Sequence, residues 1–111
     1  MTIEFNDFLK IDIRSGTIVK AENFPEARKP AFKVWVDFGE EYGIKKTSAQ
    51  ITKHYKLDEL PGMQVAGLVN VGERQIGPFR SEFLLLGFSD SQGFISLISP
   101  TEGVPNGQKL C

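Results

Sequence analysis

The sequence predicts an all-β fold, a small five-stranded Greek-key barrel with one helix between its third and fourth strands. Three observations predict it. Short segments alternate apolar and polar residues, as half-buried strands do, clusters of glycine and proline separate these segments, and a single segment in mid-chain has helical spacing. Because the chain has 111 residues, of which 41% are hydrophobic and nine are phenylalanine, we expect one domain over 1–111 with a filled core.

The N-terminal part is expected to begin with a helical turn at 5–9 and to continue as a long strand at 11–24. Apolar and charged residues alternate along this strand, which indicates one buried face. Ser15-Gly16 interrupts the alternation, and a glycine at this place predicts a bulge or a sharp bend. Residues 24–30 are expected to form a loop, because their two prolines exclude a central strand.

The second and third strands are expected at 31–38 and 44–48. Alternation in the second strand puts its phenylalanines and valines on one face and Trp35 on the other. Lys45 and Lys46 of the third strand could share this outer face with Trp35. The alternative is that Trp35 is only a partly buried aromatic residue under a loop.

A helix is predicted at 49–55, because Ser48 can cap it and Ile51 and Tyr55 are spaced to share one face. Leu57–Leu60 could add a further turn, and Pro61-Gly62 then ends the helical segment. The remaining strands are expected at 63–71, 83–88 and 94–99. Three strands, a helix and two or three further strands are the order of the OB-fold barrel, although strand alternation alone also allows a small sandwich.

The distribution of charge is more informative than the total. The net charge is −1, but residues 28–80 hold nine Lys or Arg and six Asp or Glu. This surplus allows a basic face, and the alternative is an ordinary mixed surface. No run is long enough to cross a membrane, the acidic N-terminus lacks the features of a secretion signal, and the one cysteine, Cys111, cannot form an internal disulfide, so a cytoplasmic protein is expected.

The sequence contains no set of residues that predicts catalysis. His54 is the only histidine, and no Cys/His cluster, P-loop or dinucleotide fingerprint is present. A terminal thiol with no neighbouring base is a poor nucleophile. We therefore expect a protein that is not an enzyme and that needs neither a cofactor nor a metal ion.

Binding is predicted instead for the polar link between two apolar segments, at 72–82. Asn70, Arg74, Arg80 and Ser81 can donate hydrogen bonds to an anion, and an exposed Phe79 could join Trp35 as a surface on which bases stack. In the alternative, Asn70 and Ser81 fasten the loop while the arginines are only solvated. The link is expected to run over the surface as a loop.

Several motifs resemble a known family. The segments Asp7–Ile18 and Asn70–Leu86 resemble the tRNA-binding domain of methionyl- and phenylalanyl-tRNA synthetases and of related free-standing proteins. The segments Ser15–Ile18, Phe24–Pro30, Thr47–Thr52 and Gln75–Glu82 resemble in particular its CsaA branch of export-related chaperones. Together these motifs cover nearly the whole chain and occur in the family's order.

The resemblance implies an OB-fold with terminal extensions that form a homodimer. It implies a chaperone that binds unfolded, export-bound polypeptides in the cytoplasm, with the export machinery as a further partner and without membrane insertion. The alternative function is a tRNA-binding protein whose main ligand is structured RNA. Phe83 and Leu84 replace the family's usual Gly-Met, and we expect Phe83 either in the core or in a peptide site.

The expected site residues fall into three groups. The tRNA-binding group is Lys29, Lys45, Lys46, Ser48, Asn70, Arg74, Arg80, Ser81 and Glu82. The peptide-binding group is Trp35, Phe79, Phe83 and Leu84. The dimer-interface group, chosen because both chain ends carry surplus apolar residues, is Phe5, Phe8, Leu9, Val104 and Leu110.

Overall fold

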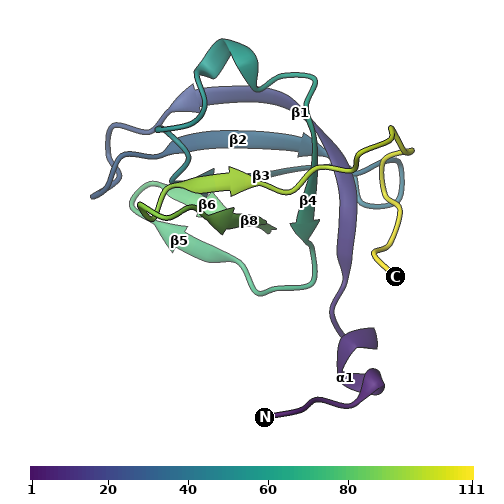
Figure 1. The fold of residues 1–111 in the computed structure, drawn as a ribbon. Coiled ribbons are helices and arrows are strands. Elements are labelled where there is room, and N and C mark those ends of the chain that lie inside the picture. Colours follow the sequence, from purple (N-terminus) through teal and green to yellow (C-terminus); the bar gives the residue numbers. More distant parts are fainter.

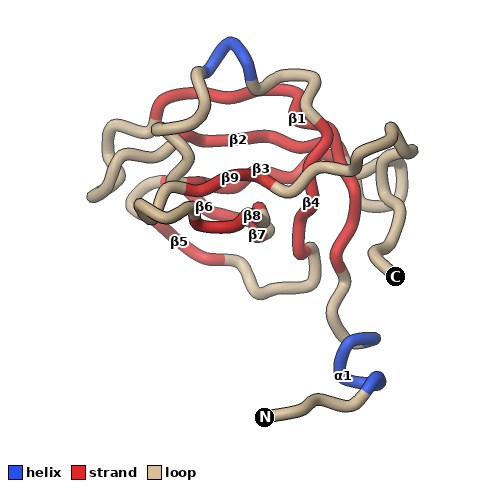
Figure 2. The backbone as a smooth tube through the Cα atoms, viewed as in Figure 1, coloured by secondary structure: helices blue, strands red, loops and turns tan.

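Five antiparallel strands form a nearly closed barrel in the computed structural model, which describes residues 1–111 (Figures 1 and 2). They are β1 (Ile13–Asn23), β2 (Phe32–Asp37), β3 (Ile44–Ala49), β4 (Gln64–Leu68) and β7 (Leu84–Leu85). Their order in the sheet is β3-β2-β1-β4-β7. The predicted all-β barrel of OB type is therefore confirmed.

The segment that leads into β7 closes the barrel against β3. The amide of Glu82 donates to the carbonyl of Lys46 (2.8 Å), and the amide of Lys46 donates to the Glu82 carboxylate (3.0 Å). The hydroxyl of Thr47, which is buried, donates to the carbonyl of Phe83 (2.7 Å). Side chains thus satisfy part of the edge of β3 that no regular strand covers.

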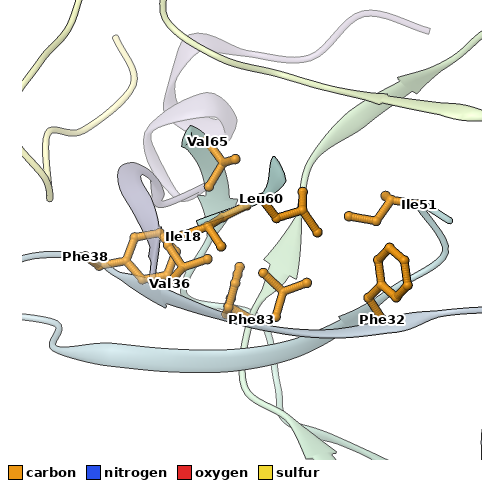
Figure 3. Packing of buried hydrophobic residues seen from close by; sticks show 9 residues of the cluster. Ile18, Phe32, Val36, Phe38, Ile51, Leu60, Val65 and Phe83 are labelled. Carbon is orange, nitrogen blue, oxygen red and sulfur yellow. The ribbon is translucent and has the colours of Figure 1, made fainter. Parts of the chain in front are cut away.

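The barrel interior is filled by the alternate residues of the strands (Figure 3). Val34 and Val36 of β2 are fully buried, as the alternation predicts, and Phe38 packs edge-to-face on Phe83 with ring centroids 4.9 Å apart. Phe83 is only 3% exposed, so the core alternative for this residue is confirmed. The main cluster consists of Ile18, Phe32, Val34, Val36, Phe38, Ile51, Leu60, Val65 and Phe83.

Gly16 lies where β1 approaches β2 very closely. A Cβ atom at this position would lie 2.5 Å from a methyl carbon of Val36 and 2.9 Å from the ring of Phe38. The register of β1 against β4 is regular at Ser15-Gly16, so the bulge, one of the two alternatives there, is instead at Val19, where the register of β1 against β2 shifts between Ile18 and Lys20. Gly16 is therefore required for the close packing of β1 on Val36 and Phe38. The bulge at Val19 changes the direction of β1 three residues later.

The predicted helix at 49–55 is wrong. Ala49 is still the last residue of β3, residues 52–54 form a turn, and the only helical turn between β3 and β4 is the 3-10 helix η1 (Leu57–Glu59), where a further turn is expected. Ile51 and Leu60 are both buried and fix the two ends of this connection. The polar residues between them offer too narrow an apolar face to stabilise a short α-helix.

Two small hairpins lie outside the main sheet. The first, β5 (Arg74–Ile76) with β6 (Phe79–Ser81), occupies the link that the sequence predicts as a loop. The second, β8 (Gly87–Ser89) with β9 (Ile95–Leu97), confirms the predicted turn at 90–93. Residues 83–88 are therefore not one strand but contain β7 and the start of β8.

Helix α1 (Phe5–Leu9) is present as predicted and projects away from the barrel (Figure 1). Its first residue follows Glu4, whose amide donates to the Asp7 carboxylate at 3.1 Å. The C-terminal segment runs beside the start of β1, where the amide of Leu110 donates to the carbonyl of Ile13 at 2.8 Å. Neither α1 nor η1 has the length and apolar character needed to cross a bilayer.

Candidate nucleic-acid interface

The outer surface of β1, β2 and β3 carries three lysines around Trp35. The strand register puts Lys20, Trp35 and Lys46 side by side in one row, and Lys33 lies in the next row. Lys33, Trp35 and Lys46 alternate with buried residues of their strands, and Lys20 is the direct partner of Trp35 in the sheet, so all four side chains lie on the outer face. We call Lys20, Lys33, Lys46 and Trp35 the basic face.

Each lysine of the basic face lies over an aromatic ring. The Lys20 ammonium is 4.6 Å from the ring centroid of Trp35, and the Lys46 ammonium is 5.1 Å from that of Phe79. Lys33 lies between two rings, 5.1 Å from Phe24 and 5.4 Å from Phe79. These cation–π contacts hold positive charges close together without neutralising them.

Hairpin β5–β6 packs against the basic face through Phe79. The Phe79 ring meets Trp35 edge-on with centroids 6.1 Å apart and lies 5.4 Å from Phe24. Phe24, Ala31 and Phe79 form a second, smaller core that also includes part of Trp35. The expectation of an exposed Phe79 is wrong, because its side chain is 6% exposed.

The two arginines of this hairpin differ in their surroundings. Arg80 is paired with the Glu73 carboxylate, and the hydrogen bond from Arg80 together with its charge lowers the pKa of Glu73. The side chain of Arg74 is exposed and has no hydrogen-bond or ion-pair partner.

The lysines of the basic face also differ in their partners. Lys33 and Lys46 lack a carboxylate partner, whereas the Lys20 ammonium is 3.0 Å from the Glu22 carboxylate. On the basic face and the hairpin, the cations without a carboxylate partner are therefore Lys33, Lys46 and Arg74.

Asn70 fastens the start of the domain rather than leaving its amide free. Its side-chain oxygen accepts a hydrogen bond from the amide of Asp12 (3.0 Å), and its nitrogen donates to the carbonyl of Lys10 (2.7 Å). This amide therefore connects the end of β4 to the segment that follows α1.

Ser81 and Glu82 fasten the hairpin to β3. The Ser81 hydroxyl, which is buried, accepts a hydrogen bond from the amide of Ser48 at 3.1 Å, and the two hydroxyls lie 3.4 Å apart. Glu82 makes two hydrogen bonds with the backbone of Lys46: its amide donates to the Lys46 carbonyl, and its carboxylate accepts from the Lys46 amide. Ser81 therefore fastens the link, as in the alternative, whereas Asn70 fastens the segment that follows α1.

Other predicted ligand residues are not brought together. Lys45 is opposite Val36 in the register and so lies on the other side of β3 from Lys46. Lys29 is exposed in the loop between β1 and β2. Leu84 is 51% exposed and pairs with Leu68 at the β4–β7 edge, away from Trp35.

The proposed peptide residues therefore do not form one surface. Phe79 and Phe83 are buried in two different clusters, Trp35 is half-buried, and Leu84 is on another side of the barrel.

Two lysines of the basic face, Lys20 and Lys33, were not identified from the sequence. Strand alternation could have placed them on the outer face, but only the register shows that they surround Trp35.

The dimer residues expected from the sequence are largely solvent-facing in the single chain. Phe5 is 72% exposed, and Leu9, Val104 and Leu110 are exposed as well. Phe8 is partly covered and lies 6.1 Å from Phe5, measured between ring centroids. Both termini leave the barrel on the side where β1 begins (Figure 1).

Comparisons with known proteins agree with this geometry. The model of the family described as "Putative tRNA binding domain" matches residues 13–109. The chaperone CsaA from Bacillus anthracis str. Ames has 42% sequence identity and a TM-score of 0.93, with 100% of both chains covered. The CsaA chaperone protein from Picrophilus torridus has 44% identity and a TM-score of 0.91, covering 99% of this chain and 100% of that one.

A curated relative is much longer. The methionine–tRNA ligase of Porphyromonas gingivalis is 35% identical over 108 residues, which are 97% of this chain but 15% of the ligase. The similarity thus concerns a small part of that enzyme. With the family model matched over residues 13–109 and this identity over nearly the whole chain, the protein belongs to the tRNA-binding domain family.

Proposed function

We propose that this chain binds tRNA on the basic face and along hairpin β5–β6. The observation that carries the proposal is the group of lysine ammonium groups held over aromatic rings, of which Lys33 and Lys46 have no carboxylate partner. Arg74 extends this group of free cations onto the hairpin. Membership of the tRNA-binding domain family supports the same ligand.

In this proposal the lysines and Arg74 bind phosphate groups of the RNA backbone. The aromatic rings beneath Lys33 and Lys46 limit the motion of both side chains, so less conformational entropy is lost when a phosphate binds. The half-buried indole of Trp35 offers an edge or face to an unpaired base. Ser81 and Glu82 act indirectly, because they keep the hairpin in place, and Asn70 fixes the segment that follows α1.

A salt series tests this function. Displaced counterions make RNA binding fall steeply with salt, so log Kd for tRNA should rise nearly linearly with log salt concentration. A reduced and carboxymethylated polypeptide serves as the second ligand, since its apolar capture should change little over the same range. If tRNA is not bound at low salt, or is bound equally at all salt concentrations, the proposal is wrong.

The second candidate function is that of a chaperone that holds unfolded, export-bound polypeptides. It is favoured by one observation, the 42–44% identity to CsaA chaperones over the whole of both chains. Trp35 and Leu84 are the predicted peptide residues with accessible surface. Suppression of the aggregation of a heat-denatured protein, at a one-to-one ratio, is the expected activity, and a lack of suppression would exclude this role.

We further propose that two copies form a homodimer through α1 and the C-terminal segment. Besides the exposed Phe5 and Leu9, a mostly apolar hollow of about 280 Å³ lies between β1, β4 and the C-terminal segment. A second copy would bury surface that the single chain exposes.

Sedimentation at micromolar concentration tests the dimer. The wild type should have the mass of two chains, and a Phe5→Asp/Leu9→Asp variant should have the mass of one. Phe88→Asp is the matched control, because Phe88 is also 72% exposed but lies on β8. A wild-type monomer, or a control variant that dissociates equally, would exclude this interface.

The proposed role is one of binding without catalysis. No three His, Cys, Asp or Glu side chains are grouped so that they could hold a metal ion. The chain matches 15% of the methionine–tRNA ligase, so the activity of that enzyme is not transferred to it. Since tRNA and newly made polypeptides occur in the cytoplasm, we propose that the protein acts there.

A further inference from the structure

A second ligand site is indicated next to the basic face. Together with Thr52, the loop between β1 and β2 borders an open hollow of about 550 Å³. The buried side chains of Phe24 and Ala31 line its inner part, and the exposed Pro25 and Pro30 line its rim. This volume is within the range of small-ligand sites. Neither Trp35 nor hairpin β5–β6 with its Phe79 lines the hollow.

Three polar side chains that line the hollow have no partner within the protein. They are the amide of Asn23, the guanidinium of Arg28 and the hydroxyl of Thr52, none of which takes part in a hydrogen bond or ion pair. No Asp or Glu lines the hollow. By contrast, the side-chain amide of Asn70 and the hydroxyl of Ser81 are both used in internal hydrogen bonds. The hollow therefore combines apolar walls with free hydrogen-bonding groups and one positive charge.

The hollow is continuous with the basic face through Phe24. The same ring lines the hollow and lies 5.1 Å below the ammonium of Lys33. A nucleic-acid strand whose phosphates contact Lys33 would thus pass the mouth of the hollow. Rings of proline and phenylalanine suit the flat surface of a base, and an amide can both donate to and accept from the edge of a base.

We propose that the hollow binds one unpaired nucleobase of the RNA, with Asn23 and Thr52 hydrogen-bonded to its edge and Arg28 on an adjoining phosphate. This inference rests on the proposed binding of RNA and deepens it, because it assigns base contact to the loop and phosphate contact to the basic face. Charge favours RNA over a polypeptide as the occupant, since Arg28 is the one charged residue that lines the hollow and Lys33, which lies over Phe24, is also positive.

The test compares two ligands with the same number of phosphates. One is a five-nucleotide adenine homopolymer of RNA, and the other is the same ribose–phosphate chain without bases. The wild type should bind the adenine oligomer about 10-fold more tightly. In an Asn23→Leu/Thr52→Val variant this preference should fall by about 3- to 10-fold, as expected for the loss of one or two hydrogen bonds, while affinity for the abasic chain stays the same. Thr101→Val, at an exposed site elsewhere, is the control and should keep the preference.

Three results would overturn the inference. Equal affinity of the wild type for both oligomers, with tRNA still bound, would remove the base pocket and leave the proposed function standing. An unchanged preference in the double variant, verified as folded by its melting temperature, would show that other residues contact the base. Loss of carboxymethylated polypeptide binding in that variant, with RNA binding intact, would make the hollow a peptide site. Absence of tRNA binding by the wild type would defeat the proposed function itself.

Discussion

Phe79 illustrates how one residue determines the position of several others. Its ring is surrounded by Trp35 and Phe24 and by the ammonium groups of Lys33 and Lys46. Burial of a phenylalanine side chain contributes roughly 1.5–3 kcal/mol, enough to hold a short two-stranded hairpin that would be marginal alone. The side chain that the sequence suggests as a stacking surface therefore anchors the hairpin and orders the lysines.

The two hairpin arginines should contribute unequally to RNA binding. Arg74→Ala should weaken tRNA binding and lower the magnitude of the salt slope by about one unit, because a free cation is lost. Arg80→Ala should have a smaller effect, since Arg80 is engaged by Glu73. Titration of both variants over a salt series measures the difference. Equal affinity and slope in the wild type and in the double variant would exclude the hairpin from the interface.

Phe83 and Leu84 are neighbours with opposite environments and make a matched pair. Phe83→Ala should lower the free energy of unfolding by roughly 3–5 kcal/mol, because it leaves a cavity beside Phe38. Leu84→Ala should cost far less stability, since Leu84 is 51% exposed. Urea unfolding of both variants gives the values. If Phe83→Ala kept wild-type stability, Phe83 would not be a core residue.

At the level of elements, a turn and the 3-10 helix η1 take the place of the expected helix. The connection after β3 is held to hairpin β8–β9, where the Tyr55 hydroxyl accepts a hydrogen bond from the amide of Leu97 (2.9 Å). The Nε2 atom of His54 is 2.8 Å from a carboxylate oxygen of Asp90, and the ring of His54 meets the ring of Phe94 edge-on. Contacts between segments far apart in the sequence thus stabilise this connection, and local spacing could not predict them.

Asp90 should make the stability of this element pH-dependent. The amide of Phe94 first, and His54 next, lower the pKa of Asp90. The folded chain therefore binds fewer protons here than the unfolded chain. The stabilisation is complete above the ordinary pKa of an aspartate, about 3.9, and is lost as the pH falls through the lower folded pKa.

Asp90→Asn should remove this part of the acid dependence. Urea midpoints measured from pH 6 down to pH 2.5 should converge for the wild type and the variant as the pH falls. His54→Ala is the control and should keep most of the dependence, because the Phe94 amide still bonds to Asp90. Parallel curves for the wild type and Asp90→Asn would contradict this role of the carboxylate.

At the scale of the molecule, the sequence predicts the barrel well and the site only in part. Alternation along β2 and the order of the strands follow from local patterns, and both are confirmed. The basic face depends on the register between β1, β2 and β3, which pairs Lys20 with Trp35 and Trp35 with Lys46. Register depends on contacts across the whole sheet, so Lys20 and Lys33 were not identified from the sequence.

The docked hairpin shows a second reason for the incomplete prediction. Its sequence contains glycine, proline and charged residues, which are typical of an exposed loop, and Phe79 is the only large apolar residue among them besides Ile76. Whether Phe79 is exposed depends on the partner surface that β2 and β3 provide. Local composition cannot supply that information, because burial is a property of the folded barrel.

The net charge of −1 hides this arrangement, since acidic residues elsewhere offset the basic face. Binding of RNA phosphates by the basic face is tested with a salt series on a Lys33→Gln/Lys46→Gln variant. A Lys53→Gln/Lys56→Gln variant has the same net charge and changes two exposed lysines of the 50–56 connection. Lys33→Gln/Lys46→Gln should weaken tRNA binding and lower the salt slope by roughly 1.5–2 units, while the control stays close to the wild type. Equal losses of affinity and slope in the two variants would refute phosphate binding by the basic face, because the binding would then follow total charge.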